Sequence, residues 1–196
     1  MDTGQWTFAA EFSTVDLLLR SNAETRGIDA FALTIIKVER QLRRLFTFLV
    51  YQQPAFTRKD VPALRRALAR NRKIFVEGFV RGFDAIYHEP LSVVVGAEYD
   101  YLHKRLDEAR AYRNKVFHGQ LTDRSLSRRD LVEMVQDLRH WSELVAENSL
   151  RAVGYDGFGR NSFRKSGIPD LPRKLRVSLS TVEEYEAFLR QYVQRA

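Results

Sequence analysis

An arginine, an asparagine and a histidine stand close together in the chain, at Arg113, Asn114 and His118. Histidine moves protons near neutral pH, and arginine stabilises charge that develops on a phosphate group. Asn114 and His118 are four residues apart and share a helix face, so the amide can orient the imidazole. These residue types suit cleavage of a phosphodiester bond, which makes the three residues the candidate catalytic set.

The helix expected from about 97 to 118 must position this set. Its apolar stripe runs through Tyr99, Leu102, Leu106, Ala109, Val116 and Phe117. Arg113 takes a place in that stripe where an apolar residue belongs. A buried guanidinium needs an anion, so Arg113 is expected to meet either a carboxylate of the protein or a phosphate at an open seam.

His118 is expected in the last turn of this helix, before Gly119 as the C-terminal cap. The helix dipole there favours the imidazolium, which fits a proton-transfer role, whereas a bond to a free carbonyl would be purely structural. His118 is five positions after Arg113 in the chain, an angle of roughly 140° on a regular helix. The pair therefore needs a distorted last turn or a site completed across an interface.

The rest of the chain is predicted to be mostly helical. Apolar residues at alternating steps of three and four indicate a helix over 29–51, and the segment 60–87 is expected to be helical with a break near Asn71. His88-Glu89-Pro90 ends that segment. Ser127 with Asp130, and Ser180 with Glu183, resemble capping boxes that begin two later helices.

Glycine, proline and basic residues change the character of the chain after Val153. The segment 154–173 is predicted to be a loop, 175–179 a short edge strand and the region up to about Tyr192 a helix. We therefore expect an all-α helical bundle over 1–153 with a basic loop–short strand–helix extension over 154–196.

Composition limits the possible functions. The 196 residues carry 32 Lys and Arg against 25 Asp and Glu, a net charge of +7, and contain no cysteine. The basic charge suits either a polyanionic partner or a solvated basic surface. Disulfides, thiolate metal sites and cysteine nucleophiles are excluded. The four histidines lack the spacing of a helical metal-ligand pair, so no metal or cofactor is expected. Neither a membrane span nor a signal peptide is visible, and a cytoplasmic protein is expected.

Arg113-Asn114-x-x-x-His118 at the end of a helix in an all-helical chain resembles the R-x4-6-H motif of the HEPN superfamily. Asn directly after Arg and Gly directly after His agree with the extended form of that motif. The resemblance covers about residues 29–152. A second match, Arg81 with His88, lacks the polar residue after its arginine and ends at Glu89-Pro90.

The resemblance implies a metal-independent endoribonuclease of the toxin or antiviral-defence type. Attack of a ribose 2′-OH would leave a 2′,3′-cyclic phosphate and a 5′-OH, with His118 transferring the proton, Arg113 stabilising charge and Asn114 orienting the histidine. Two motifs usually face each other in this family, so a homodimer is implied, and an antitoxin or defence-system protein is an expected partner. Glu39 and Arg43 have the spacing of an auxiliary E-x3-K pattern, with arginine in place of lysine; the alternative is a surface ion pair between residues four apart.

RNA is the substrate that this reading implies. Basic residues expected to bind it are Lys115, Arg160, Arg164 and Lys165, with Tyr155, Phe158 and Phe163 interleaved for stacking on bases. The alternatives are a non-catalytic helical module that binds RNA and a protein-interaction module in which Arg113 and His118 are merely structural. Cleavage, salt-dependent binding without cleavage, or loss of stability alone upon substitution would distinguish the three.

Overall fold

The computed structural model describes residues 8–71, 76–117, 126–159 and 161–194, apart from the side chains of residues 114, 116 and 117. It divides the chain into two compact units. Unit 1 comprises Met1–Val38 and Gly96–Val145, and unit 2 comprises Glu39–Val95 and Ala146–Ala196. This division differs from the boundary after residue 153 that the sequence suggests, because two long helices each contribute to both units.

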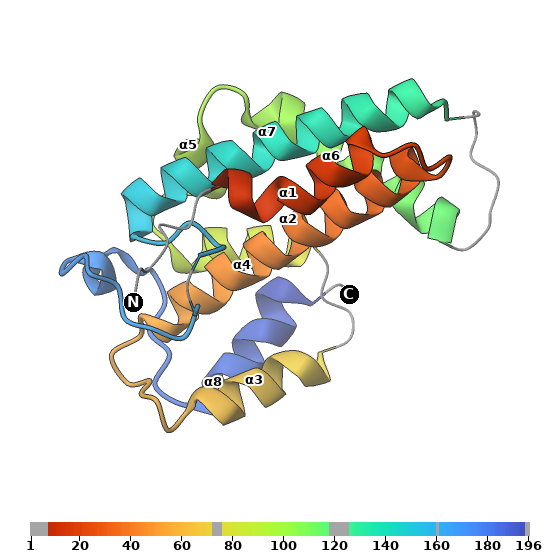
Figure 1. Cartoon of the computed structure of the whole chain (residues 1–196). Helices are drawn as coiled ribbons and strands as arrows, with labels where there is room; N and C mark the ends of the chain where they lie inside the picture. The colour runs from red at the N-terminus through yellow and green to blue at the C-terminus, as the bar shows by residue number, and fades with distance from the viewer. Residues whose placement is uncertain (1–7, 72–75, 118–125, 160, 195–196) are drawn as a thin grey trace, which may run out of the picture. The chain divides into compact units, whose positions relative to one another are not determined.

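Every regular element in the described residues is helical (Figure 1). They are α1 (Phe8–Arg20), α2 (Arg26–Tyr51), α3 (Val61–Arg70), α4 (Val76–Ile86), α5 (Leu91–Val95), α6 (Tyr99–Phe117), α7 (Arg128–Val153), the 3₁₀ turn η1 (Leu171–Lys174), α8 (Val182–Phe188) and the π-helical turn η2 (Leu189–Val193). The all-α prediction is confirmed. The edge strand expected at 175–179 is not formed; Leu175 makes only an isolated antiparallel bridge with Tyr87.

Unit 1 is built from α1, the first half of α2, α6 and most of α7. Helices α6 and α7 run antiparallel, because Arg105 Nε lies 2.6 Å from Asp137 Oδ2 while Tyr99 packs on Trp141 with ring centroids 5.2 Å apart. Helix α1 runs along the first half of α2 (Figure 1). An ion pair of 3.1 Å between Glu11 and Lys37 fastens the two. The buried apolar side chains of unit 1 include Phe12, Val15, Phe31, Ile35, Leu102, Leu106, Leu138 and Trp141.

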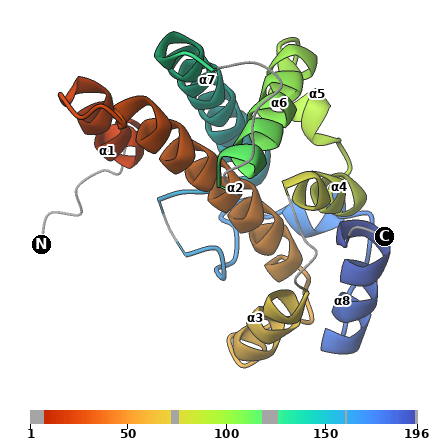
Figure 2. The same cartoon turned by 90° about the vertical axis from the view of Figure 1, so that its right-hand side faces the viewer.

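Unit 2 packs α3 beside α8, and the C-terminal turn η2 against α4 (Figure 2). Two glycines of α4 allow this close approach, since a Cβ at Gly78 would lie 2.1 Å from the carbonyl oxygen of Val193. At Gly82 a Cβ would lie 2.6 Å from the ring of Phe46. Arg81 donates from Nε to the carbonyl of Tyr192 at 3.1 Å, so α4 also ties down the end of the chain.

Two buried glutamines at the end of α2 hold the C-terminal segment in unit 2. The amide of Gln52 donates to the carbonyl of Arg164 at 3.1 Å and accepts from the backbone N–H of Ser166 at 2.7 Å. The amide of Gln53 donates to the carbonyl of Val177 at 2.8 Å and accepts from the N–H of Leu179 at 3.2 Å. The segment 175–179 thus finds side-chain partners where a strand would use a neighbouring strand.

Most helix boundaries agree with the sequence. A break separates α3 from α4, where Asn71 caps α3, and α7 begins with the Ser127–Asp130 capping box. The last cap lies one residue later than expected, because the side chain of Thr181, and not that of Ser180, accepts from the N–H of Glu184. Helix α1 was not expected as a separate element.

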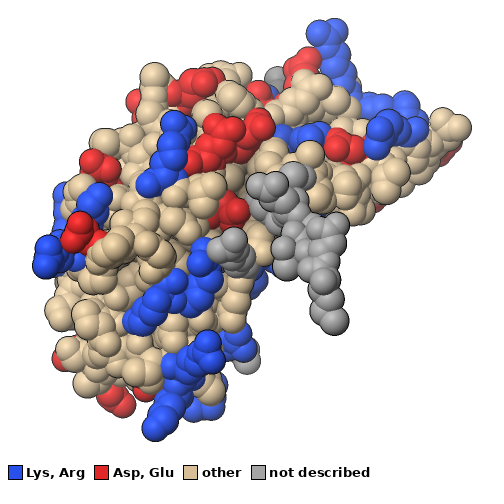
Figure 3. Space-filling model, turned by 60° about the vertical axis from the view of Figure 1, so that its left-hand side comes forward, with Lys and Arg blue, Asp and Glu red and all other residues tan. Residues whose placement is uncertain are grey.

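Charge differs strongly between the two units. Unit 2 contains 20 Lys and Arg against 11 Asp and Glu, a formal charge of +9, whereas unit 1 contains 12 against 14, a formal charge of −2. Figure 3 shows Lys and Arg side chains in several groups on one face of the molecule. The basic character of the whole chain therefore comes from unit 2.

Candidate active site

Helix α6 presents the arginine and asparagine of the motif near its C-terminal end. Arg113 and Asn114 lie in its final five residues. His118 follows the last residue of α6 in the chain and lies outside the described residues, as does Gly119. The side chain of Asn114 also lies outside the description.

The apolar stripe of α6 is buried as its spacing predicts. Leu102, Leu106 and Ala109 have relative exposures of 1% or less. Arg113 continues this stripe and is half-buried, and its Nε atom is inaccessible to solvent. The guanidinium therefore stands at the edge of the unit 1 core, where electrostatic interactions are stronger than in bulk water.

Polar and aromatic contacts with α7 fix the orientation of α6. Arg105 donates to Asp137 at 2.6 Å and to Glu108 at 2.7 Å. The hydrogen bond to Asp137 raises the pKa of Arg105 above its ordinary value. Because this anchor lies two turns before Arg113, it limits how far the end of the helix can rotate.

Each histidine of unit 1 that the structure describes lies close to a carboxylate. His103 stacks on Tyr99 with centroids 5.1 Å apart, and its Nδ1 lies 3.5 Å from Asp107. His140 Nε2 lies 3.0 Å from a carboxylate oxygen of Glu98. No group of three or more His, Asp or Glu residues in the described part of the chain is placed to hold a metal ion.

The second motif match, Arg81 with His88, belongs to unit 2. Arg81 donates to the carbonyls of Tyr192 and Val193, while the backbone N–H of His88 donates to the carbonyl of Lys174 at 3.0 Å. The His88 ring packs edge-on against Tyr87. Both residues thus have structural contacts that connect α4 to the C-terminal segment.

The auxiliary residues Glu39 and Arg43 lie on α2, in the part assigned to unit 2. Glu39 is half-buried and Arg43 is exposed. Their participation in the site stays a prediction.

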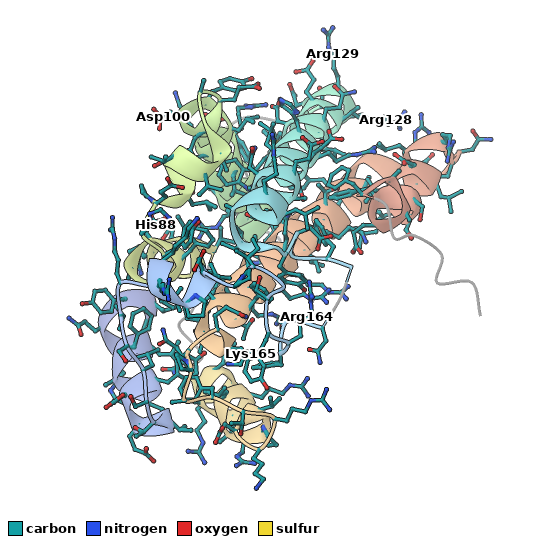
Figure 4. All side chains as sticks on the ribbon, turned by 90° about the vertical axis from the view of Figure 1, so that its left-hand side faces the viewer. His88, Asp100, Arg128, Arg129, Arg164 and Lys165 are labelled. Atoms are coloured by element: carbon teal, nitrogen blue, oxygen red, sulfur yellow. The ribbon has the colours of Figure 1, made fainter. Side chains whose placement is uncertain are left out.

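Arg164 and Lys165 lie beside the C-terminal part of α2 (Figure 4). Arg164 donates to the carbonyl of Gly154 at 3.1 Å, and its guanidinium lies 5.7 Å from the ring centroids of both Phe48 and Tyr155. Lys165 donates to the carbonyl of Tyr51 at 2.6 Å, so both side chains hold the loop against α2. Lys115 is half-buried on α6, and Arg160 lies outside the described residues.

Two of the three aromatic residues proposed to stack on bases are buried. Tyr155 is 1% exposed and Phe158 is 3% exposed, so neither ring is available to a nucleotide. Tyr155 instead stacks on Phe48 with centroids 4.8 Å apart, and burial raises its pKa to about 12. Phe163 is half-buried, so stacking on a base stays a prediction for Phe163 alone.

The sequence pattern did not indicate Arg44 and Arg65, whose guanidinium groups lie over two of these aromatic rings. Arg44 lies 5.9 Å from the ring centroid of Tyr155, and Arg65 of α3 lies 5.0 Å from that of Phe163. Their partners are about 100 residues away in the chain, so helical spacing carries no indication of the pairing. The aromatic residues of the loop were the one local indication that other side chains would stack on its rings.

Comparison with protein-family models, with curated proteins and with solved structures found no match. In the described part of the chain, the helices are too short or too polar to cross a membrane.

Proposed function

We propose that this chain is a HEPN-type, metal-independent endoribonuclease that acts as a homodimer. The observation that carries the proposal is the position of Arg113 and Asn114 at the end of α6, one of the longer helices of an all-α chain. The burial of the Arg113 Nε atom adds support, because a guanidinium at the edge of a core is held in place before substrate arrives.

The proposed reaction is an internal transesterification. The ribose 2′-oxygen attacks the adjacent phosphorus while the bond from phosphorus to the 5′-oxygen breaks, which leaves a 2′,3′-cyclic phosphate and a 5′-OH. His118 transfers the proton and Asn114 orients its ring, while Arg113 stabilises the negative charge that builds on the phosphate oxygens. A strand without the 2′-OH lacks the nucleophile and is not cut.

Dimerisation follows from the number of motifs and their angle. The chain holds one credible motif, and Arg113 and His118 are separated by roughly 140° around a regular helix. A two-fold axis brings Arg113 of one protomer towards His118 of its partner, because such an interface juxtaposes the same surface of both copies. The site is therefore complete only in the dimer.

A comparison of two substrates, with and without a free 2′-OH, tests this proposal directly. A single-stranded RNA and the same strand with 2′-O-methyl groups are incubated with wild-type protein and with Arg113→Lys in EDTA. We expect cleavage only of the unmodified RNA, and a large loss of rate in Arg113→Lys, because an ammonium cannot reproduce a planar bidentate contact. Equal cleavage of the 2′-O-methyl strand would overturn the mechanism. Salt-dependent binding without cleavage would favour the non-catalytic RNA-binding alternative.

A further inference from the structure

A row of cations and aromatic rings connects α2 to α3 through the loop of unit 2. At one end, Arg44 and Arg164 both lie over the ring of Tyr155, at 5.9 and 5.7 Å. Next along the chain, Lys165 lies 4.7 Å from the ring centroid of Tyr51. We call the surface formed by Arg44, Arg65, Phe163, Arg164 and Lys165 the basic face.

Phe163 connects the second half of the row. Its ring meets that of Tyr51 edge-on with centroids 5.7 Å apart, and it carries the guanidinium of Arg65 at 5.0 Å. Arg65 is exposed, and Phe163 is half-buried. A guanidinium that stacks on a ring is held in one orientation, and its N–H groups point outward in the plane where a phosphate binds.

Two carboxylates close to the row in sequence accept hydrogen bonds within their own turns, and the charge of Asp156 also acts on Tyr155. Asp156 accepts from the backbone N–H groups of Phe158 and Gly159 at 2.8 and 3.1 Å. Asp60 accepts from the backbone N–H and the hydroxyl of Thr57, and these hydrogen bonds lower its pKa. The four cations of the basic face are part of the 20 Lys and Arg that give unit 2 its formal charge of +9.

We infer that the basic face binds the phosphate backbone of single-stranded RNA. Four of its five members are cations and three of these are arginines, the side chain suited to planar phosphate contacts. Arg164 and Lys165 also donate to backbone carbonyls, so they add positive charge to the face, and Arg44 and Arg65 are the members expected to contact phosphate. Phe163 adds a half-exposed ring on which a base can stack. This inference rests on the proposed function, which identifies RNA as the polyanionic substrate.

The composition of the face favours RNA over a lipid surface. Proteins that bind membranes through a basic surface commonly add exposed apolar side chains that enter the bilayer interface. The large exposed apolar residues in the described part of the chain are Leu17, Ile28, Ile36, Val93, Tyr101, Leu150 and Tyr192. None of them belongs to the basic face, whose single apolar member, Phe163, is half-buried.

The test measures binding separately from cleavage. A fluorescent single-stranded oligonucleotide with 2′-O-methyl groups is titrated by anisotropy over a range of salt concentrations, with circular dichroism to verify folding. The test variant is Arg44→Gln/Arg65→Gln. The matched control is Arg128→Gln/Arg129→Gln, which removes two exposed arginines from the first turn of α7 (Figure 4).

We expect the face variant to bind roughly tenfold or more weakly at about 0.1 M salt, with a salt slope shallower by about 1.4 from two lost phosphate contacts. The control should retain the affinity and the slope of the wild type. Phe163→Leu, which keeps every charge, should weaken binding while leaving the slope unchanged. Equal weakening in both double variants, or no weakening in either, would overturn the inference.

Two further outcomes distinguish this inference from the proposed function and from binding to an anionic lipid. Binding that depends on the basic face in a protein that cuts no RNA would sustain the inference and refute the proposed function. Vesicles rich in phosphatidylserine that bind through Arg44 and Arg65, with RNA binding unchanged in the variant, would assign the face to an anionic lipid and overturn the inference.

Discussion

The ammonium of Lys165 lies 2.6 Å from the carbonyl oxygen of Tyr51 and 2.8 Å from that of Gln53, so a loop residue caps the C-terminal end of α2. The last carbonyls of a helix have no partner within the helix, and a cation near them also meets the negative end of the helix dipole. Burial lowers the pKa of Lys165. The contact joins the loop to α2 at the point where Gln52 and Gln53 also hold the C-terminal segment.

Lys165→Met should therefore destabilise the protein. The methionine keeps part of the side chain's volume but loses both hydrogen bonds to backbone carbonyls, a loss of about 1–3 kcal/mol in the free energy of unfolding. Chemical denaturation measures this change. The control Lys174→Met removes an exposed lysine and should change stability by less than about 0.5 kcal/mol. Equal stability of the two variants would show that the cap contributes nothing.

Gly78→Ala should destabilise the packing of α4 on η2. An added Cβ would lie 2.1 Å from the backbone oxygen of Val193, so the helix or the chain end must move. We expect a loss of about 2 kcal/mol or more, despite the gain of about 1 kcal/mol that alanine ordinarily brings to a helix. Thermal or urea unfolding measures it.

Gly167→Ala is the matched control, because nothing lies within 4 Å of a Cβ built there. Its stability should stay within about 0.5 kcal/mol of the wild type. A Gly78→Ala variant more stable than the wild type would mean that α4 and η2 are not packed as described.

Tyr155 should make the protein lose stability at high pH. Its pKa is raised from 10.0 to about 12 by burial, so between these values the folded state holds a proton that the unfolded state has released. Stability then falls as pH rises through this range, by up to about 1.4 kcal/mol per pH unit. Below pH 10 the full stability of the folded protein with respect to this group is present.

Tyr155→Phe removes this contribution, so its stability should decline less steeply above pH 10 than that of the wild type. Urea midpoints measured across the alkaline range test this. Tyr192→Phe replaces an exposed tyrosine and should follow the wild-type curve. Parallel curves for wild type and Tyr155→Phe would contradict the burial of this phenol.

The sequence was most informative where contacts are local. The periodicity of α2, the break near Asn71 and the Ser127–Asp130 cap all depend on residues within four positions of one another. The half-buried position of Arg113 followed from the same periodicity, because one polar residue interrupts an otherwise apolar stripe.

Long-range partners explain what the sequence could not indicate. The alternating segment 175–179 suits a strand, but the buried Gln53 bonds the carbonyl of Val177 and the N–H of Leu179, while the N–H of Arg176 donates to the carbonyl of Ile86. Tyr155 looked suited to nucleotide stacking, but Phe48, more than 100 residues earlier, covers its ring. Buried glutamines and ring pairs of this kind depend on which helices become neighbours, and no local spacing encodes that choice.

In the proposed reaction, Arg113 and His118 cut RNA without a metal. The most direct measurement incubates purified wild type, His118→Ala and the control His140→Ala with total cellular RNA in EDTA, and then identifies the chemistry of the cut ends. The control removes the ring that pairs with Glu98 on the same unit. Cleavage by wild type and His140→Ala but not by His118→Ala, with 2′,3′-cyclic phosphate and 5′-OH ends, is the predicted result. Equal cleavage by His118→Ala, or its absence in all three folded proteins, would contradict it.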